Sequence, residues 1–246
     1  MSVDRLAEHR EIWARKPLLA DLYAPWFEAL LQEVRHGGRA LEVGAGPGFL
    51  APFARERGHP LRLWSVDVLE APWNHAAADA HRLPFAAGAF DAVLALDVVH
   101  HLADPARFFS ECVRVLSAGG RIAVVEPWVT PLSYPIYKWL HEERCRSGLD
   151  PWRPFASGDG KEPFEGDAGV FCQLIRETAP EQWRGLGLRP PRVRLLNGLA
   201  YLLSLGFWRF SLLPRSLAPA VIAFDRLLAP AAPLLAIRAI VVWERE

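Results

Sequence analysis

Apolar residues recur at three- and four-residue steps over the first part of the chain, which is the spacing of amphipathic helices. The pattern begins near Asp4, continues to about Arg35 and stops at Gly37-Gly38. The sequence therefore predicts helices within residues 1–37, and we expect them to form a lid on the domain that follows.

Beyond residue 38, short apolar runs alternate with helical patterns. The runs read RALEV, LRLWSV, FDAVLAL and GRIAVVE. The clearest helix is predicted from Pro105 to Leu116, because Asp104 stands at the N-cap, Pro105 in the first turn and Gly119-Gly120 behind the end. Such alternation is typical of the α/β class, with a parallel sheet that carries helices on both faces.

The rhythm of strands and helices breaks after Pro127. Residues 128–191 are rich in Trp, Pro and Gly, and we interpret them as an insertion on the acceptor side, after the fifth strand. Residues 192–246 return to strand-like runs, VRLLNGLAYLL and AIRAIVVWE, around a helix-like stretch from Ser216 to Leu228. We expect one domain over residues 1–246, with residues 38–127 as its core.

Composition and charge argue against several functions. The 246 residues carry 28 basic and 28 acidic side chains, so the sequence lacks the positive charge that draws proteins to nucleic acid. Three cysteines without metal-ligand spacing predict no metal site and a reducing, cytoplasmic location. The first twenty residues show no signal-peptide pattern, and the longest uncharged run, Leu195 to Trp208, is 14 residues, too short for a bilayer span.

The segment from Leu41 to Leu50, LEVGAGPGFL, carries the most chemical information. Its glycines follow a predicted strand and open a helix, where they allow positive φ angles and close approach of the backbone to a nucleoside. Asp67 ends the next strand, where a carboxylate can accept from both ribose hydroxyls. Asp79 follows twelve residues later, placed to reach an adenine amino group. Each has a structural alternative: a tight turn, a strand-end cap or a solvated loop acid.

Together with Phe90-Asp91, His100-His101-Leu102 and LSAGGR before GRIAVVEP, these motifs resemble the class I S-adenosylmethionine-dependent methyltransferases. The likeness is to the branch similar to ubiquinone and menaquinone biosynthesis methyltransferases (methyltransferase type 11). It implies a Rossmann-like sheet of seven strands with the last strand antiparallel, and S-adenosyl-L-methionine as cofactor. It also implies that the cofactor is bound by Glu42, Gly44, Ala45, Gly46, Gly48, Asp67, Asp79, Ala80 and Leu96.

Residues on the acceptor side are harder to assign. Methyl transfer is an in-line displacement in which alignment supplies much of the rate, so a base is optional. His101 is the catalytic candidate, as base or acceptor orienter, because it follows the fourth strand at the edge where such sheets bind ligands. The alternative is that His100 and His101 only cap or pack a loop. Asp97 is interpreted as a helix-start acid, outside the site.

Two further groups of residues have both a functional and a structural interpretation. The insertion residues line an acceptor pocket or form an exposed helix with one apolar face: Tyr134, Tyr137, Trp139, His141, Glu142 and Glu143. Four arginines lie within 11 residues: Arg184, Arg189, Arg192 and Arg194. They either bind a phosphate of the substrate or lie in solvent at the start of a strand.

The expected function is therefore methyl transfer to a small-molecule or lipid-linked acceptor. Between Leu195 and Ile240 charges are few, and aromatics and leucines are interleaved with arginines, which favours an apolar acceptor and a peripheral membrane contact. The alternative is that these apolar residues form ordinary core. The alternatives are a catalytically silent cofactor-binding partner protein, a nicotinamide-dependent oxidoreductase and, least favoured, a nucleic-acid methyltransferase. The oligomeric state has no signal in the sequence.

Overall fold

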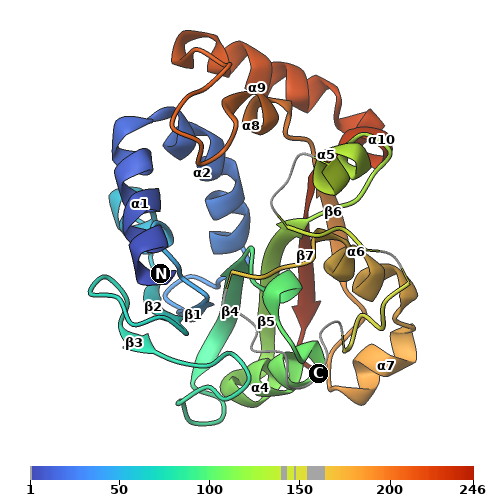
Figure 1. Cartoon of the computed structure of the whole chain (residues 1–246). Coiled ribbons are helices and arrows are strands. Elements are labelled where there is room, and N and C mark those ends of the chain that lie inside the picture. Colours follow the sequence, from blue (N-terminus) through green and yellow to red (C-terminus); the bar gives the residue numbers. More distant parts are fainter. Residues whose placement is uncertain (1, 140–142, 147, 154–163) are drawn as a thin grey trace.

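A computed structural model describes the chain except for residues 1, 140–142, 147 and 154–163. Seven strands form one sheet in the order β3-β2-β1-β4-β5-β7-β6 (Figure 1). The first five strands pair in parallel, and β7 runs antiparallel to both of its neighbours. The bounds are β1 Arg39–Val43, β2 Arg62–Asp67, β3 Ala76–Ala77, β4 Phe90–Leu96, β5 Leu116–Pro127, β6 Arg192–Leu196 and β7 Arg238–Glu244.

Alternate residues of the central strands point to two separate apolar clusters, one on each face of the sheet. Val93 and Val124 pack on one face with helices α4 (Pro105–Val115), α6 (Ala168–Glu177) and α7 (Pro180–Gly185). Leu94 and Val125 pack on the other face with α1 (Ser2–Arg15), α2 (Leu18–Leu31) and α3 (Leu50–Glu56). This period-two division is what places helices on both faces.

The observed architecture confirms the predicted α/β fold, its antiparallel last strand and its N-terminal helices. It also confirms the helix after Asp104, whose side chain accepts from the backbone N–H of Arg107 at 3.0 Å. Between β5 and β6 the chain forms α5 (Ser133–Trp139), α6 and α7, so the predicted insertion contains helices of its own.

The interpretation of VRLLNGLAYLL as one strand-like run was wrong beyond Leu196. β6 ends there, and Leu199–Ser204 form helix α8. The carboxylate of Asp225 accepts hydrogen bonds from the backbone N–H groups of Leu199 and Ala200, each at 3.1 Å, and so caps α8 from a distant part of the chain.

The C-terminal helices lie together at one end of the molecule, next to α2 (Figure 1). They are α8, α9 (Ala218–Leu227) and α10 (Ala232–Leu235), with short 3₁₀ turns at Arg215–Leu217 and Ala229–Ala231. Within the described residues no single helix is long and apolar enough to cross a membrane. One bent pair, Arg215–Leu227 with Ala229–Leu235, passes that test on length and composition, with a 60° bend between the two helices.

Candidate functional site

The glycine-rich loop leaves the carboxyl end of β1 in a backbone conformation that favours glycine. Gly44, Gly46 and Gly48 have φ angles of 68°, 52° and 73°. A Cβ atom on Gly44 would lie 2.4 Å from Cγ2 of Val98, and one on Gly48 would lie 2.5 Å from Cδ1 of Trp73. Positive φ and close packing therefore both require glycine here.

Asp67 ends β2 beside this loop. Its Oδ2 accepts from the backbone N–H of Gly46 at 2.7 Å, and its Oδ1 accepts from the N–H of Leu69 at 2.8 Å. A carboxylate offers about four acceptor positions, so these two bonds leave capacity for the two hydroxyls of a ribose. The sequence predicts Asp67 near the loop, and the structure has it there. The structure adds that the Asp67 carboxylate also holds the loop through its hydrogen bond with Gly46.

The N-terminal helix covers the glycine loop from outside. The side chain of Leu6 is buried and packs near Gly46, and the ring of Trp13 stacks on Phe49 with centroids 4.0 Å apart. Arg10 donates to the carbonyl of Pro47 at 2.6 Å. Helix α1 therefore lies as a lid over the loop, as its predicted position implies.

Glu42 lies on β1, one residue before the strand ends, and is buried. Its carboxylate accepts from Oγ of Ser65 at 2.6 Å. Burial raises its pKa to about 7, the Ser65 hydrogen bond opposes that shift, and the nearby charge of Asp67 adds to it. Glu42 therefore changes protonation near neutral pH, which the sequence did not indicate.

The remaining residues implied for the cofactor lie around the same edge of the sheet. Oδ1 of Asp79 accepts from the backbone N–H of His81 at 2.9 Å and lies 2.7 Å from Nδ1 of its ring. Burial by itself raises the pKa of Asp79. The contacts with His81 outweigh that effect, so the net shift of the pKa is downward. Ala80 is buried, and Leu96 is the last residue of β4.

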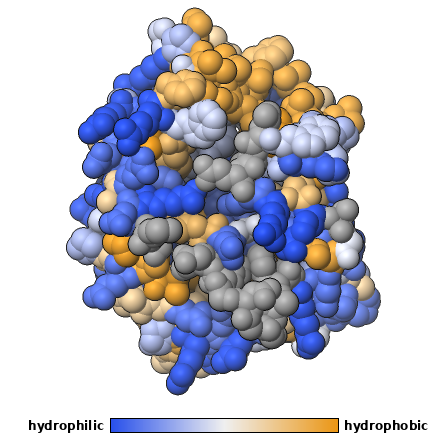
Figure 2. Space-filling model, in the orientation of Figure 1, coloured by the Kyte–Doolittle hydropathy of each residue, from blue (hydrophilic) through white to orange (hydrophobic). Residues whose placement is uncertain are grey.

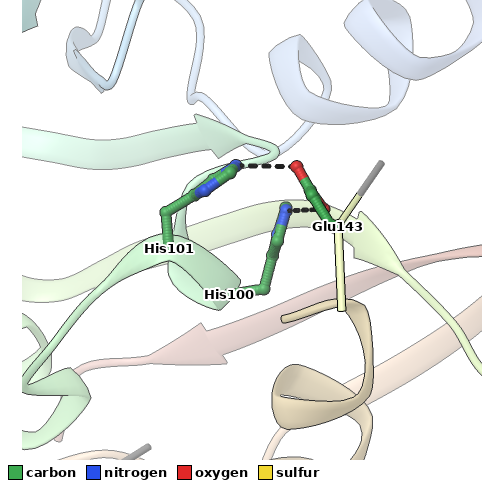
Figure 3. Close-up of side chains that lie close together, drawn as sticks. All are labelled: His100, His101 and Glu143. Atoms are coloured by element: carbon green, nitrogen blue, oxygen red, sulfur yellow. Dashed lines mark ion pairs between the residues drawn. The ribbon is translucent and has the colours of Figure 1, made fainter. Parts of the chain in front are cut away.

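Two histidines and two glutamates meet just beyond β4. His100 and His101 end a 3₁₀ turn, Val99–His101. Nδ1 of His100 lies 2.5 Å from Oε2 of Glu126, and its Nε2 lies 3.1 Å from Oε2 of Glu143. Nε2 of His101 lies 3.4 Å from the other Glu143 oxygen (Figure 3).

This cluster separates the pKa values of its two histidines. Burial lowers the pKa of His100, but the carboxylates of Glu126 and Glu143 raise it to about 10. Burial and the neighbouring His100 charge lower the pKa of His101 to about 4. Glu126 has a lowered pKa despite its burial, because His100 and the backbone N–H groups of residues 98 and 99 stabilise its charged form.

Asp97 is more than a helix-start acid. It has a positive φ of 57°, and its carboxylate forms a close ion pair with Arg238 on β7. The Arg238 guanidinium lies over the rings of Trp26 and Tyr201, 4.8 and 5.4 Å from their centroids. The pair therefore joins the end of β4 to β7 and to α2, close to the histidine turn.

Sequence reasoning missed Glu126, Trp73 and Arg238 as parts of this edge. Glu126 had a usable signal, since it stands near the end of a predicted strand as Asp67 does. Trp73 and Arg238 had none, because their contacts join segments that are far apart in the chain.

The insertion aromatics take different places. Tyr137 is buried and donates to the carbonyl of Ile237 at 2.5 Å, whereas Tyr134 and Trp139 are exposed. His141 and Glu142 lie outside the described residues.

Three of the four clustered arginines form ion pairs, so their arrangement supports the solvated-strand interpretation. Arg184 pairs with a residue of its own helix, Glu181, at 3.3 Å. Arg189 lies 2.7 Å from Glu244, and Arg192 lies 3.1 Å from Glu33. Their charges are already balanced by carboxylates, which weakens the phosphate interpretation.

The strand order, the antiparallel last strand and the glycine loop facing an acid at the end of β2 define the class I S-adenosylmethionine-dependent methyltransferase fold. A family model described as a methyltransferase domain matches residues 41–124. Residues 41–124 thus match a methyltransferase domain, and the fold around them is that of enzymes that use S-adenosyl-L-methionine as cofactor.

Curated relatives agree with the family. A protein named as an uncharacterized methyltransferase from Mycobacterium sp. (strain JLS) is 32% identical over 122 residues, covering 46% of this chain and 48% of the relative. A ubiquinone biosynthesis O-methyltransferase from Dinoroseobacter shibae is 29% identical over 172 residues, covering 57% and 66%. The chain thus spans about half the length of the first of these relatives.

Solved structures share the fold. A SAM-dependent methyltransferase from Archaeoglobus fulgidus has a TM-score of 0.51 at 18% identity and covers 94% of both chains. Phosphoethanolamine N-methyltransferase 2 from Haemonchus contortus, in complex with S-adenosyl-L-methionine, has a TM-score of 0.53 at 16% identity, covering 90% of this chain and 52% of that one. These comparisons do not favour a nicotinamide-dependent oxidoreductase.

The residues of this chain fit the cofactor. At Gly46 the nearest atom to an added Cβ is Cδ2 of Leu6, at 3.8 Å, so the backbone at this point of the loop leaves room for close approach. The Asp67 carboxylate is held at the loop by two backbone N–H groups, and its remaining acceptor positions suit the ribose hydroxyls.

Proposed function

We propose that the chain transfers a methyl group from S-adenosyl-L-methionine to a small hydrophobic or lipid-linked acceptor. The observation that carries the proposal is the hydrogen bond that the backbone N–H of Gly46 donates to Asp67. It joins the glycine loop to the carboxylate that we assign to the ribose. When bound, the cofactor supplies a methyl group on a sulfonium, which is displaced in line by the acceptor.

Each residue at this edge has a role in that proposal. Asp67 accepts from the ribose hydroxyls, and the loop from Gly44 through Ala45 and Gly46 to Gly48 lets the backbone approach the cofactor. Glu42 borders the methionine end. Asp79 and Ala80 frame the adenine, and Leu96 supports the site from the end of β4.

His101 is proposed to orient the acceptor or to accept its proton. The 3₁₀ turn that carries it follows β4 directly, and Val98 in the same segment packs against Gly44. The turn therefore joins the glycine loop to the acceptor side. Proximity and alignment are what such a displacement needs most, so a residue that fixes the acceptor there contributes directly.

An exposed apolar surface supports an apolar acceptor and a peripheral membrane contact. Figure 2 shows hydrophobic residues gathered at the end of the molecule formed by α8 to α10. We define the apolar end by Trp208, Phe210, Leu212, Leu217, Phe224, Leu227 and Leu234, which are all exposed. Only Ala218 of α9 is buried, and this helix presents Phe224 and Leu227 to the outside.

Two measurements test the methyl transfer. Calorimetry with S-adenosyl-L-methionine tests cofactor binding, and transfer of a labelled methyl group into a host extract tests turnover. Extraction into organic or aqueous solvent then assigns the class of acceptor. Cofactor binding without any turnover would favour the catalytically silent partner protein instead.

Liposome flotation tests the membrane contact. We expect the chain to float with vesicles, and Leu212→Glu combined with Leu227→Glu to abolish flotation, because both side chains lie in the apolar end. Val193→Glu is the control, since Val193 is exposed on β6 outside that end. A chain that never floats and methylates only polar metabolites would contradict both parts of the proposal.

A further inference from the structure

Three side chains beyond β4 direct potential metal ligands at one point. The ligand atoms of His100, His101 and Glu143 all lie within 4.8 Å of one another. Figure 3 shows the two imidazole rings facing the single carboxylate, with the Nε2 atoms 3.1 and 3.4 Å from its two oxygens. Two imidazoles and one carboxylate are a ligand set that binds divalent transition metals.

The two nitrogen–oxygen separations match those of ligands around one ion, and the ligand atoms of all three residues lie within 4.8 Å of one another. Atoms bonded to a common metal at about 2.1 Å are about 3.0–3.4 Å apart along the edges of an octahedron or a tetrahedron. The two nitrogen–oxygen distances fall at 3.1 and 3.4 Å. The same distances suit a simple ion-pair network, so the decision depends on what surrounds the three ligands.

The surroundings hold the histidines as metal-binding sites do. Glu126 accepts from the backbone N–H groups of Val98 and Val99 at 2.8 and 2.7 Å, and these bonds fix its carboxylate. It also lies 2.5 Å from Nδ1 of His100, so that nitrogen keeps its proton, while Nε2, which faces Glu143, gives up its proton when it binds an ion. The ring of His101 hydrogen-bonds to the backbone of Glu165. A carboxylate or carbonyl behind each imidazole is the usual outer partner of a ligating histidine.

Burial limits competition from water. The side chain of His100 is 2% exposed, and those of His101 and Glu143 are 17% and 19% exposed. The cluster is therefore shielded, and only His101 and Glu143 of the three side chains keep appreciable contact with solvent. Three protein ligands leave a further coordination position, as catalytic zinc sites do.

We propose that Nε2 of His100, Nε2 of His101 and the carboxylate of Glu143 bind one divalent transition-metal ion of the zinc class, with Glu126 as a positioning residue. The spacing of the cysteines predicts no metal site. The two adjacent histidines form a metal site only together with Glu143, which comes from the insertion. Binding of the ion does not depend on the proposed function. Its role does: the open position would take an oxygen or nitrogen of the acceptor, which is how His101 would orient it.

The test is titration of the chelator-treated chain, without a histidine tag, with Co²⁺ and then with competing Zn²⁺. We expect one equivalent of Co²⁺ to bind with visible ligand-field absorption, and Zn²⁺ to remove that absorption. His101→Ala and Glu143→Gln should each weaken Co²⁺ binding by at least about 100-fold, because each loses a ligand. Glu126→Gln should weaken it by about 10- to 100-fold.

His59→Ala is the matched control. His59 forms a comparable pair with Glu28, at 3.1 Å, but within the part of the chain that the structure describes it belongs to no group of three possible ligands. Its loss should leave Co²⁺ binding unchanged. Zn²⁺ should also raise the melting temperature of the wild-type chain and not that of Glu143→Gln, which separates binding from a folding defect.

The proposal would be overturned if the wild-type chain bound no stoichiometric Co²⁺. It would also be overturned if the ligand variants bound Co²⁺ as the wild type does. The cluster would then be an ion-pair network without a metal. Calorimetry with S-adenosyl-L-methionine on the same samples separates the two proposals. Cofactor binding without Co²⁺ binding would overturn the metal site alone. Co²⁺ binding without cofactor binding would overturn the proposed function alone.

Discussion

The guanidinium of Arg10 donates a hydrogen bond of 2.6 Å to the backbone carbonyl of Pro47, while its Cζ lies 4.5 Å from the ring centroid of Trp73. Trp73 in turn donates from Nε1 to the carbonyl of Gly46 at 2.8 Å. Helix α1 and the segment after β2 therefore hold the glycine loop together. Movement of α1 away from the loop must break the Arg10 contacts.

Arg10→Ala should therefore speed dissociation of the cofactor. Arg10 is exposed, so its charged hydrogen bond is screened and we expect an effect of about two- to fivefold on the dissociation rate, measured by stopped-flow fluorescence. Arg15→Ala is the control, because the ion pair of Arg15 is with Glu11 of its own helix. Equal rates in the two variants would show that α1 does not retain the cofactor through Arg10.

Asp67→Ala should lower the affinity for S-adenosyl-L-methionine by about ten- to a hundredfold, or roughly 1.5–3 kcal/mol, because it removes charge-assisted hydrogen bonds. It also removes the acceptor of the Gly46 N–H, so loop order is lost as well. Asp67→Asn keeps one carbonyl oxygen and should lose less. Calorimetry measures both, with Glu70→Ala, an exposed acid on the same segment, as control. Unchanged binding by Asp67→Ala would refute its assignment to the ribose.

The parallel strands of the core were predictable because they are short buried runs bounded by turn residues. RALEV and FDAVLAL are buried on both faces, and their ends carry the glycine loop and the histidine turn. Since carboxyl ends of parallel strands share one edge, the sequence also predicted that Asp67 would lie near that loop.

Other features depend on contacts that no local pattern records. The run LLNGLAYLL is apolar on both sides of Asn197 and Gly198, so its period does not separate strand from helix. The deciding cap comes from Asp225 on α9. The histidine cluster likewise combines the turn after β4 with Glu126 of β5 and Glu143 of the insertion. His101 was a candidate from its position alone, but its partners were not visible in the sequence.

Gly48→Ala should destabilise the chain more than Gly58→Ala does. Both glycines have positive φ, 73° and 66°, which costs alanine about 1–2 kcal/mol. A Cβ on Gly58 meets nothing within 4 Å, whereas one on Gly48 lies 2.5 Å from Trp73. The clash should add about 1–3 kcal/mol, measured by denaturant unfolding. Equal losses would mean that Trp73 moves aside freely and does not shape the loop.

Glu42 should make the unfolding free energy of the cofactor-free chain depend on pH. Its pKa is about 7 in the folded chain against an ordinary value of 4.5, so between these pH values the folded state binds more protons than the unfolded state. Stability should therefore fall as pH rises through this window, by on the order of 2–3 kcal/mol, and level off above it. Glu42→Gln stays neutral and should remove this component of the slope, whereas Glu56→Gln, on the exposed end of α3, should retain it. Urea unfolding at several pH values measures the slope. An identical slope in wild type and Glu42→Gln would show that Glu42 is already ionised when the chain folds.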